Sequence, residues 1–328
     1  MMYSRQQGMA LIYVLLIFSL MTLMASQILT SLWQQTRKSS HYLDRAQARL
    51  YAQGAEQYIA LKLEEDIRLD QENGRHVDHL NEQWNLYGSA YDIDDGIIHI
   101  KVMDQQSRLN INNLAATNSY AYQSLLILQN LMRSFSLSPT LAYRIKDWVD
   151  KDREVAPGGA EDATYLRMIP PYRAASTDMR SLTELDLIAG LNRESNQQLA
   201  RELTTLPQVS GININTASRD LLLSLSNELT ALEVDAIIQA RSGKGLANIT
   251  ELLQIPELAT KATLFQSLPL SFNSRYFSAI IQVKYRQTQY KMHSWFERDI
   301  SGNVYIIRRV IGYSGYRNVR ENSSRRLA

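Results

Sequence analysis

The residues of this chain whose types and spacing could do chemistry are carboxylates gathered in one stretch. Six acidic side chains stand against two basic ones within 16 residues. Asp150 and Asp152 lie two apart, ahead of the turn Pro157-Gly158-Gly159. Such a turn can fold these aspartates back toward Glu161 and Asp162. Clustered carboxylates repel one another unless protons or a cation neutralise them.

A cation that suits this stretch is a hard one. The stretch contains no His and no Cys, and oxygen ligands alone select Ca²⁺ or Mg²⁺ over Zn²⁺. A compartment outside the cytoplasm would favour Ca²⁺. The spacing is not that of an EF-hand loop. The alternative is a solvated acidic loop in which Trp148 is a core residue that anchors the loop.

Several other classes of function are excluded by composition. Cysteine is absent, which excludes disulfide scaffolds, zinc fingers, iron–sulfur sites and thiol nucleophiles. Thirty-five basic and 33 acidic residues give a net charge of +2, too balanced for a chain held to nucleic acid by a global positive field. There is no P-loop, nucleophile elbow or dinucleotide fingerprint. His76 and His79 fit surface positions in a polar loop. The sequence therefore predicts a protein that is not an enzyme and binds no nucleic acid.

The elements around the acidic stretch are predicted to be helical. Residues 105–272 are rich in Leu, Ala, Asn and Ser at helical spacing. They contain a degenerate repeat, since residues 109–113 recur as 212–216 and residues 181–188 recur as 248–255. The second element of each copy has the capping-box pattern that starts a helix. The first copy is longer by about 36 residues, and these include the acidic stretch.

Strands are predicted on both sides of this helical region. Residues 84–91 and 97–103 read as strands around an Asp94-Asp95-Gly96 turn. Three β-branched and aromatic runs follow near the carboxyl terminus, at residues 276–287, 290–298 and 303–312. The pattern predicts an antiparallel sheet with an all-α insertion in one of its loops, which is tolerated because the ends of such a loop can lie close together.

The amino-terminal segment is long and apolar enough to cross a membrane. Arg5 is followed by no charged side chain until Arg37. Residues 9–32 number 24, of which 18 are apolar, and as a helix they span about 36 Å against roughly 30 Å of bilayer hydrocarbon. A cleaved secretory signal would need a small residue where Leu23 stands. The helix is expected to continue to about Arg68, with the body outside the cytoplasm.

The same segment resembles a type IV prepilin leader. Residues 1–8 end in Gly8, and Met9 opens the apolar stretch. The resemblance implies that a membrane-embedded prepilin peptidase cuts after Gly8 and methylates Met9. Most pilins and pseudopilins have Glu as the fifth mature residue, whereas this chain has Tyr13. A buried carboxylate is costly unless a partner of opposite charge neutralises it. A subunit without this glutamate therefore does not need a neighbouring subunit as that partner.

This departure is usual in the type II secretion minor pseudopilin K family, whose members are proposed to cap the pseudopilus tip. The acidic stretch is similar to that family in order and spacing, through Asp-Trp-Val-Asp-x-Asp at 147–152 and Gly-Ala-Glu-Asp at 159–162. The resemblance implies calcium binding in this loop. Ser176 stands where the family pattern leads us to expect Asn. The expected ligands are Asp150, Asp152, Glu161 and Asp162, with Asp178 a weaker candidate.

The expected fold is α+β, a pilin-like long helix packed on an antiparallel sheet with a large helical insertion of SAM-like or helix-hairpin-helix-like type. The expected segments are a leader at 1–8, a membrane span at 9–32, a discontinuous domain at 33–104 and 273–328, and an insertion at 105–272. The resemblance implies an inner-membrane protein with a periplasmic body, acting in pseudopilus initiation and protein export. Its expected partners are other minor pseudopilins, prepilin peptidase, and the secretin or an exoprotein.

Two alternatives share parts of this pattern. One is a minor pilin of a type IV pilus or competence system. The other is a membrane-anchored DNA receptor, because residues 213–218 resemble the opening of helix-hairpin-helix domains. In the latter, a Gly-rich turn would present N–H groups to phosphate, but residues 225–229 carry Glu228 there, which phosphate would repel.

Overall fold

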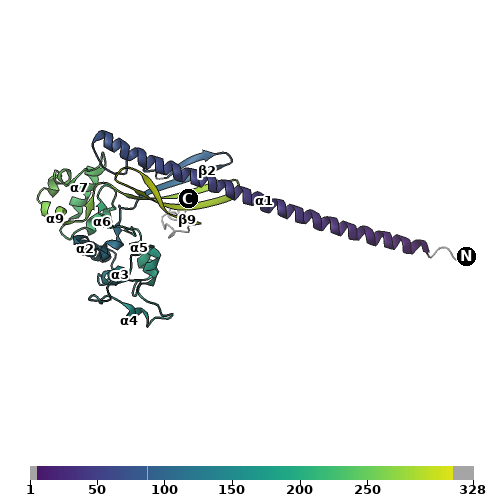
Figure 1. Cartoon of the computed structure of the whole chain (residues 1–328), viewed down its shortest axis with the longest axis horizontal. Coiled ribbons are helices and arrows are strands. Elements are labelled where there is room, and N and C mark those ends of the chain that lie inside the picture. Colours follow the sequence, from purple (N-terminus) through teal and green to yellow (C-terminus); the bar gives the residue numbers. More distant parts are fainter. Residues whose placement is uncertain (1–5, 87, 313–328) are drawn as a thin grey trace, which may run out of the picture.

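One long helix dominates the molecule, whose computed structural model describes residues 6–86 and 88–312. Helix α1 (Gln6–Asn73) has 68 residues, and its amino-terminal half projects alone from the folded body (Figure 1). Gly74 follows with φ +63°, a left-handed conformation that glycine adopts without strain. The apolar amino-terminal helix therefore continues into the body as the sequence predicts, and it ends at Asn73, five residues beyond the expected end near Arg68.

A five-stranded antiparallel sheet packs against the carboxyl-terminal half of α1. Its strands are β1 (Ser89–Ile93), β2 (Gly96–Asp104), β7 (Tyr276–Tyr285), β8 (Thr288–Arg298) and β9 (Val304–Ile311), in the order β1-β2-β7-β8-β9. β2 lies beside β7, with Asp104 opposite Phe277. The chain thus leaves the sheet and returns to it at neighbouring positions, and everything in between forms the insertion.

The first strand begins later than the sequence predicts. A strand was expected from Trp84, but β1 starts at Ser89. Trp84 lies in a turn, where its ring is 1% exposed and packs edge-on against Phe277 at 5.1 Å. A buried aromatic in a turn gives the same apolar signal as one in a strand, which explains the error.

Small side chains let α1 approach the sheet closely. Ala48 and Ala52 are fully buried, and Ile59 and Leu63 fill the space between helix and strands. These positions recur at helical spacing on one face. They fix which side of α1 faces the sheet and which faces outward.

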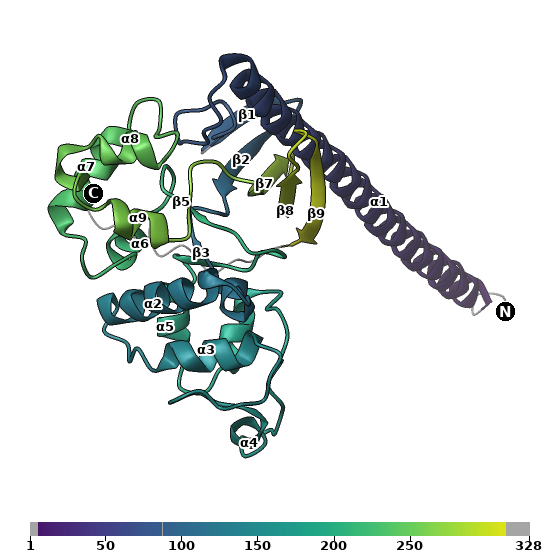
Figure 2. The same cartoon turned by 60° about the vertical axis from the view of Figure 1, so that its left-hand side comes forward.

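The regular elements of the insertion are short helices and four two-residue strands, joined by loops, and Figure 2 shows it as two lobes. The first lobe contains β3 (Leu109–Asn110), η1 (Ile111–Ala115), α2 (Ser119–Ser134), α3 (Leu141–Val149), α4 (Asp162–Tyr165), η2 (Leu182–Leu187), α5 (Arg193–Leu199) and β4 (Leu203–Thr204). The second contains β5 (Ile212–Asn213), α6 (Arg219–Ser224), α7 (Ala231–Arg241), α8 (Ile249–Leu253), η3 (Pro256–Leu258), α9 (Ala262–Ser267) and β6 (Leu270–Ser271).

The repeat in the sequence is also a repeat in hydrogen bonding. In each lobe, a buried asparagine at the fourth position of the motif accepts one backbone N–H and donates to two backbone carbonyls on returning segments. The partners are Met179 and Leu206 for Asn112, at 2.8 to 3.0 Å, and Leu246 and Phe272 for Asn215, at 2.7 to 3.1 Å. Each lobe also closes with a short parallel pairing, β3 with β4 and β5 with β6.

Candidate metal centre

Helix α3 and the loop after it position the acidic residues of the first lobe. The apolar face of α3 is buried, and Trp148 on this face packs edge-on against Tyr165 of α4 at 5.2 Å. Asp150 ends the helix, and its N–H donates to the Lys146 carbonyl at 2.9 Å. Both ends of the acidic loop are therefore held by packed aromatic rings.

Asp147 organises this loop from inside. Its side chain is 0% exposed, and Oδ2 accepts the N–H groups of Ala156 at 3.2 Å and Ala160 at 2.9 Å. A Cβ at Gly159 would stand 2.0 Å from the same oxygen, so only glycine fits there. Gly158 has φ +83°, which other residues rarely adopt. The predicted Pro-Gly-Gly turn is thus shaped by contact with a buried carboxylate.

The fold brings three of the predicted ligands together, two from before this turn and one from after it. Asp150, Asp152 and Glu161 each offer a carboxylate oxygen within 4.8 Å of the other two. Asp150 and Glu161 are buried, whereas Asp152 is exposed. One oxygen of Asp150, one of Glu161 and one of the adjacent Asp147 are buried without a hydrogen-bond partner. Buried oxygens in this state are costly, and a bound cation would satisfy them.

The charge of this group is only partly neutralised. Burial, together with repulsion from the carboxylates of Asp147 and Asp150, raises the pKa of Glu161 to about 7. Burial likewise raises the pKa of Asp147. Lys146 supplies one positive charge, with its Nζ 2.7 Å from Asp150 Oδ2. The group therefore has both the oxygen donors and the excess negative charge that a divalent cation requires.

The two other predicted ligands lie outside this group. Asp162 opens α4, where its Oδ1 accepts the N–H of Ala174 at 3.0 Å. Asp178 is exposed. Ser176 has φ +43°, a left-handed conformation that asparagine tolerates better than serine. This preference gives a backbone reason for the Asn that the family pattern places there.

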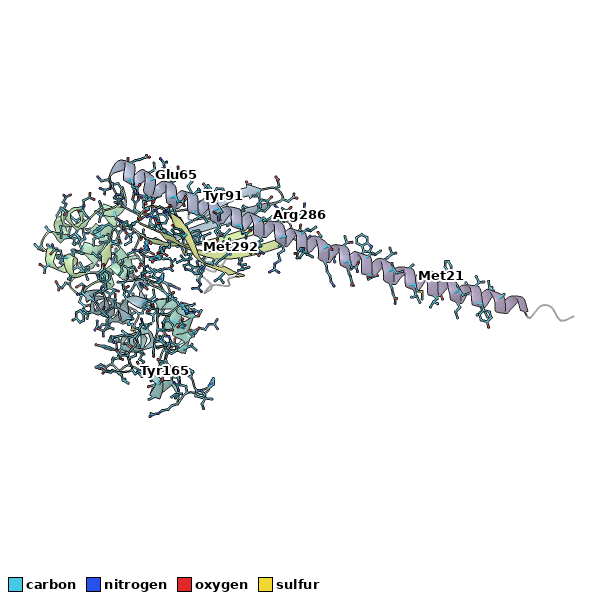
Figure 3. All side chains as sticks on the ribbon, viewed as in Figure 1. Met21, Glu65, Tyr91, Tyr165, Arg286 and Met292 are labelled. Atoms are coloured by element: carbon cyan, nitrogen blue, oxygen red, sulfur yellow. The ribbon has the colours of Figure 1, made fainter. Side chains whose placement is uncertain are left out.

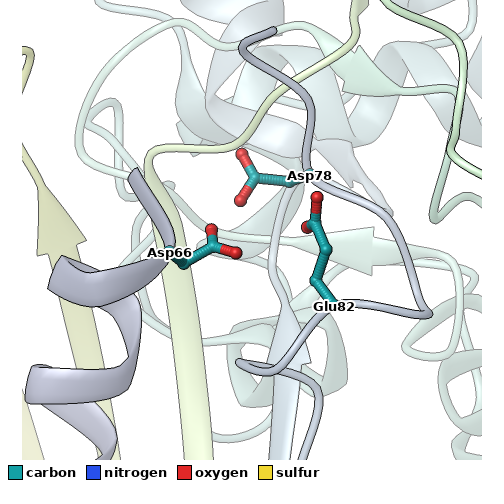
Figure 4. Close-up of side chains that lie close together, drawn as sticks. All are labelled: Asp66, Asp78 and Glu82. Carbon is teal, nitrogen blue, oxygen red and sulfur yellow. The ribbon is translucent and has the colours of Figure 1, made fainter. Parts of the chain in front are cut away.

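A second carboxylate cluster lies where α1 meets the insertion, and sequence reasoning missed it. Figure 4 shows Asp66 of α1 and two residues of the following loop, Asp78 and Glu82, turned toward one another. Arg298 at the end of β8 lies among them, buried, with its guanidinium 2.9 Å from Asp66 and 2.6 Å from Asp78. Because Arg298 is paired with two of the three carboxylates, the cluster is a buried ion-pair centre.

The same cluster joins three parts of the chain. Asp78 accepts the Ser274 N–H at 2.6 Å, and the Ser274 hydroxyl donates to Asp104 at the end of β2 at 2.7 Å. Asp104 also accepts from Asn213, the second residue of the repeat motif in the second lobe, at 3.0 Å. Helix, sheet and insertion are therefore connected through one buried polar network.

Burial raises the pKa values of this network. It raises the pKa of Asp66 to about 7, with Asp78 adding repulsion and Arg298 opposing the shift. It raises the pKa of Glu82 to about 8 and that of Asp104 to about 6. Near neutral pH the cluster therefore holds protons that the same groups would release in water.

The predicted membrane segment is exposed from Ala10 onward. Every side chain from Ala10 to Leu43 is exposed, and the most apolar window of this helix has a mean hydropathy of 2.1. Among the described residues, α1 is the one helix long and apolar enough to cross a membrane. The Gly8-Met9 bond lies in its first turn. Tyr13 is 63% exposed within the apolar stretch.

Comparison with known proteins agrees with this architecture. Residues 107–208 and 212–271, which contain the two lobes, match the family described as Type II secretion system (T2SS), protein K. Type II secretion system protein K of Klebsiella pneumoniae is 30% identical, covering 90% of this chain and 94% of the relative. The Pseudomonas aeruginosa protein is 27% identical, covering 94% of each.

Among solved structures, a chain of the GspK-GspI-GspJ complex from enterotoxigenic Escherichia coli has the same fold. The TM-score is 0.71 at 24% identity, and the match covers 85% of this chain and all of the other. The resemblance to the protein K family is thus confirmed over most of the chain. The chain belongs to the type II secretion system protein K family, the minor pseudopilins of that system.

Proposed function

We propose that this chain caps the tip of the type II secretion pseudopilus, as a structural subunit without enzymatic activity that takes part in pseudopilus initiation and in protein export. The observation that carries the proposal is Tyr13. The first acidic residue of the chain is Asp44, so the apolar part of α1 has no carboxylate to offer to a neighbouring subunit. A helix without that charge can end a filament, since no later subunit is needed to neutralise it.

The proposal includes a defined placement of the chain. α1 anchors it once in the inner membrane, and the body lies in the periplasm. Prepilin peptidase removes residues 1–8 and methylates Met9. The exposed apolar segment of α1 supports this placement, because bare apolar surface of that length is stable in hydrocarbon rather than in water.

The outward face of α1 suits other helices. Leu43, Leu50 and Leu61 are 65%, 60% and 62% exposed, and their spacing puts them on one face. Ala46 and Gly54, also exposed, lie between them and allow close approach. The similar solved structure is a complex of GspK, GspI and GspJ. We therefore propose that this chain packs its outward α1 face against the helices of its own minor pseudopilin partners.

The insertion supports a terminal position. Figure 3 places Tyr165 of the insertion and Met21 of the projecting helix at opposite ends of the molecule. The two-lobed insertion, which lies beyond the sheet, would block the space that the next subunit of a filament would occupy.

The position can be measured by gold labelling of sheared pseudopili with antibody against the insertion. Tip capping predicts label at one end of each fibre. Label distributed along the shaft would show an ordinary shaft subunit and contradict the proposal. Labelling of the major pseudopilin along the same fibres is the control.

We further propose that the acidic loop holds calcium. Its support is the set of unpartnered buried oxygens of Asp147, Asp150 and Glu161, with Asp152 close by. These are hard oxygen donors, the type that Ca²⁺ prefers. Calcium would neutralise the loop and rigidify the first lobe, and its binding would add to the stability of the folded state.

Thermal melting with calcium or with a chelator tests this. Binding at a hundredfold excess over Kd adds about 2.7 kcal/mol, so the chelator should lower the melting temperature by several degrees. Asp152→Asn removes an exposed ligand without disturbing the core, and this variant should lose most of the shift. The matched control is Asp178→Asn, which should keep it. A wild-type melting temperature that is the same with calcium and with chelator would remove the calcium proposal.

A further inference from the structure

On the amino-terminal side of the part of α1 that packs on the sheet, the same face of the helix carries basic side chains. His41 lies 11 residues before Ala52, and Arg37 lies 11 before Ala48, which is about three helical turns in each case. Arg45 lies seven residues before Ala52, close to two turns. These three side chains are exposed and point to the side on which the sheet packs further along the helix.

The charge on this segment is one-sided and uncompensated. Between Trp33 and Leu50 the sequence carries Arg37, Lys38, Arg45 and Arg49 against one acid, Asp44. Asp44 is 8% exposed and pairs with Arg286 of the β7–β8 turn at 3.2 Å. The outward positions of the same turns are uncharged, with Ser39, Leu43 and Ala46.

The place of these cations along the helix indicates what they meet. Trp33 is 72% exposed at the end of the apolar segment, and an indole ring prefers the level of the lipid headgroups. Arg37 and Lys38 begin about one turn later, and long basic side chains reach toward phosphate from such positions. Figure 1 shows the insertion and most of the sheet on one side of the helix axis, and the helical spacing turns the basic face to that same side.

We propose that this basic face, made of Arg37, Lys38, His41 and Arg45, binds the headgroups of anionic phospholipids beneath the body of the protein. The proposal rests on the membrane anchoring of α1 proposed above. Anionic headgroups attract cations on one side of α1 only, which sets the direction in which the helix leans and holds the body over the bilayer. The outward apolar face then stays turned to partner helices.

Trp33 provides a direct reporter, because it is the only tryptophan of α1. Full-length protein is reconstituted in phosphatidylcholine vesicles that contain either brominated phosphatidylglycerol or brominated phosphatidylcholine, and bromine quenching of Trp33 gives the relative affinity of the two lipids. Each cation near an anionic surface contributes about fivefold. We expect wild type to favour phosphatidylglycerol strongly, and less so in high salt.

The test variant is the triple substitution Arg37→Gln, Lys38→Gln and Arg45→Gln, which should reduce the preference to about one. The matched control removes three exposed cations of the insertion, through Arg167→Gln, Arg193→Gln and Arg201→Gln, and should keep the wild-type preference.

Each outcome has a distinct meaning. The lipid proposal is overturned if the wild-type protein shows no lipid preference or if the triple variant keeps it. In either case, quenching of Trp33 by brominated phosphatidylcholine would still support the anchoring. Absence of quenching by either lipid overturns the anchoring, and the lipid proposal with it. If the triple variant keeps its lipid preference but no longer co-purifies with other pseudopilins, the face serves an acidic protein partner and the lipid proposal is wrong.

Discussion

At the scale of single residues, the two carboxylate clusters differ in what neutralises them. Asp150 and Glu161 have buried oxygens without hydrogen-bond partners and a single lysine nearby. We therefore proposed that a metal ion neutralises this group. Asp66 and Asp78 share Arg298, and the remaining excess of negative charge is relieved by protons. Similar side chains therefore offer oxygen ligands for the proposed metal ion in one place and predict pH-dependent stability in the other.

Glu82→Gln should reduce the pH dependence of stability. Burial raises the pKa of Glu82 to about 8, against about 4.3 in an unfolded chain. Between these values the folded state binds a proton that the unfolded state releases, so stability falls as pH rises from about 4 to 8. Melting temperatures of the Gln variant should fall less between pH 5 and 8. Exposed Glu194→Gln should match wild type, and an unchanged slope for Glu82→Gln would contradict the assignment.

Arg298→Met should be strongly destabilising. The substitution leaves Asp66 and Asp78 buried without their cation, which costs about 3–5 kcal/mol in comparable buried pairs. Arg286 also pairs with two aspartates but has a side chain 52% exposed, so Arg286→Met should cost no more than about 1 kcal/mol. Urea unfolding measures both. Equal losses would show that the Arg298 centre is not a stability centre.

The sequence could identify only one of the two clusters. Asp150, Asp152 and Glu161 lie close together in the chain, next to a turn whose glycines reveal that it folds back. Asp66 and Arg298 are 232 residues apart, and each looks like an ordinary surface charge until the fold brings them together. Asp147 was counted among the acidic residues, but its structural role depends on backbone contacts that spacing alone does not reveal.

At the scale of elements, the periodic segments were predictable and the short ones were not. Helix α1 and the strands β7, β8 and β9 have enough residues to show their period. The two-residue strands β3 to β6 have no period to show, so the insertion was expected to be purely helical. Trp84 was assigned to a strand because a buried aromatic residue in a turn has the same apolar character in the sequence as one in a strand.

Asn112→Ala and Asn215→Ala should have similar effects because the two residues occupy equivalent positions. Each change removes three hydrogen bonds and leaves buried backbone groups without a partner, for a loss of about 3 kcal/mol. Gln57→Ala, on the exposed face of α1, should stay within about 0.5 kcal/mol. Denaturant unfolding measures all three. A large effect at only one asparagine would mean that the lobes are not equivalent.

The two faces of α1 can be distinguished by cross-linking, because the chain has no native cysteine. A photoreactive maleimide on Leu50→Cys should form adducts with other pseudopilins in assembled complexes. The same probe on Arg45→Cys, exposed on the other face, should form few. Mass spectrometry identifies the adducts, and equal yields at both positions would argue against a partner on the outward face.

At the scale of the whole molecule, the chain is a long helical rod with a sheet on one side and a two-lobed insertion at the end away from the apolar segment. The polar network around Arg298 connects the rod, the sheet and the second lobe, so the insertion is held in place relative to α1. In the proposed tip position, the subunit would pack laterally against other helices and would offer a later subunit neither a carboxylate to neutralise nor free space to enter.

The mature amino terminus is the most direct test of this view. Intact mass and terminal sequencing of the membrane-bound protein, isolated from cells with and without prepilin peptidase, show where the chain begins. Processing predicts a methylated Met9 as first residue when the peptidase is present, and an uncut chain when it is absent or when Gly8 is replaced by a larger residue. A chain that keeps residues 1–8 in the presence of active peptidase would contradict the assignment as a processed pseudopilin at the tip.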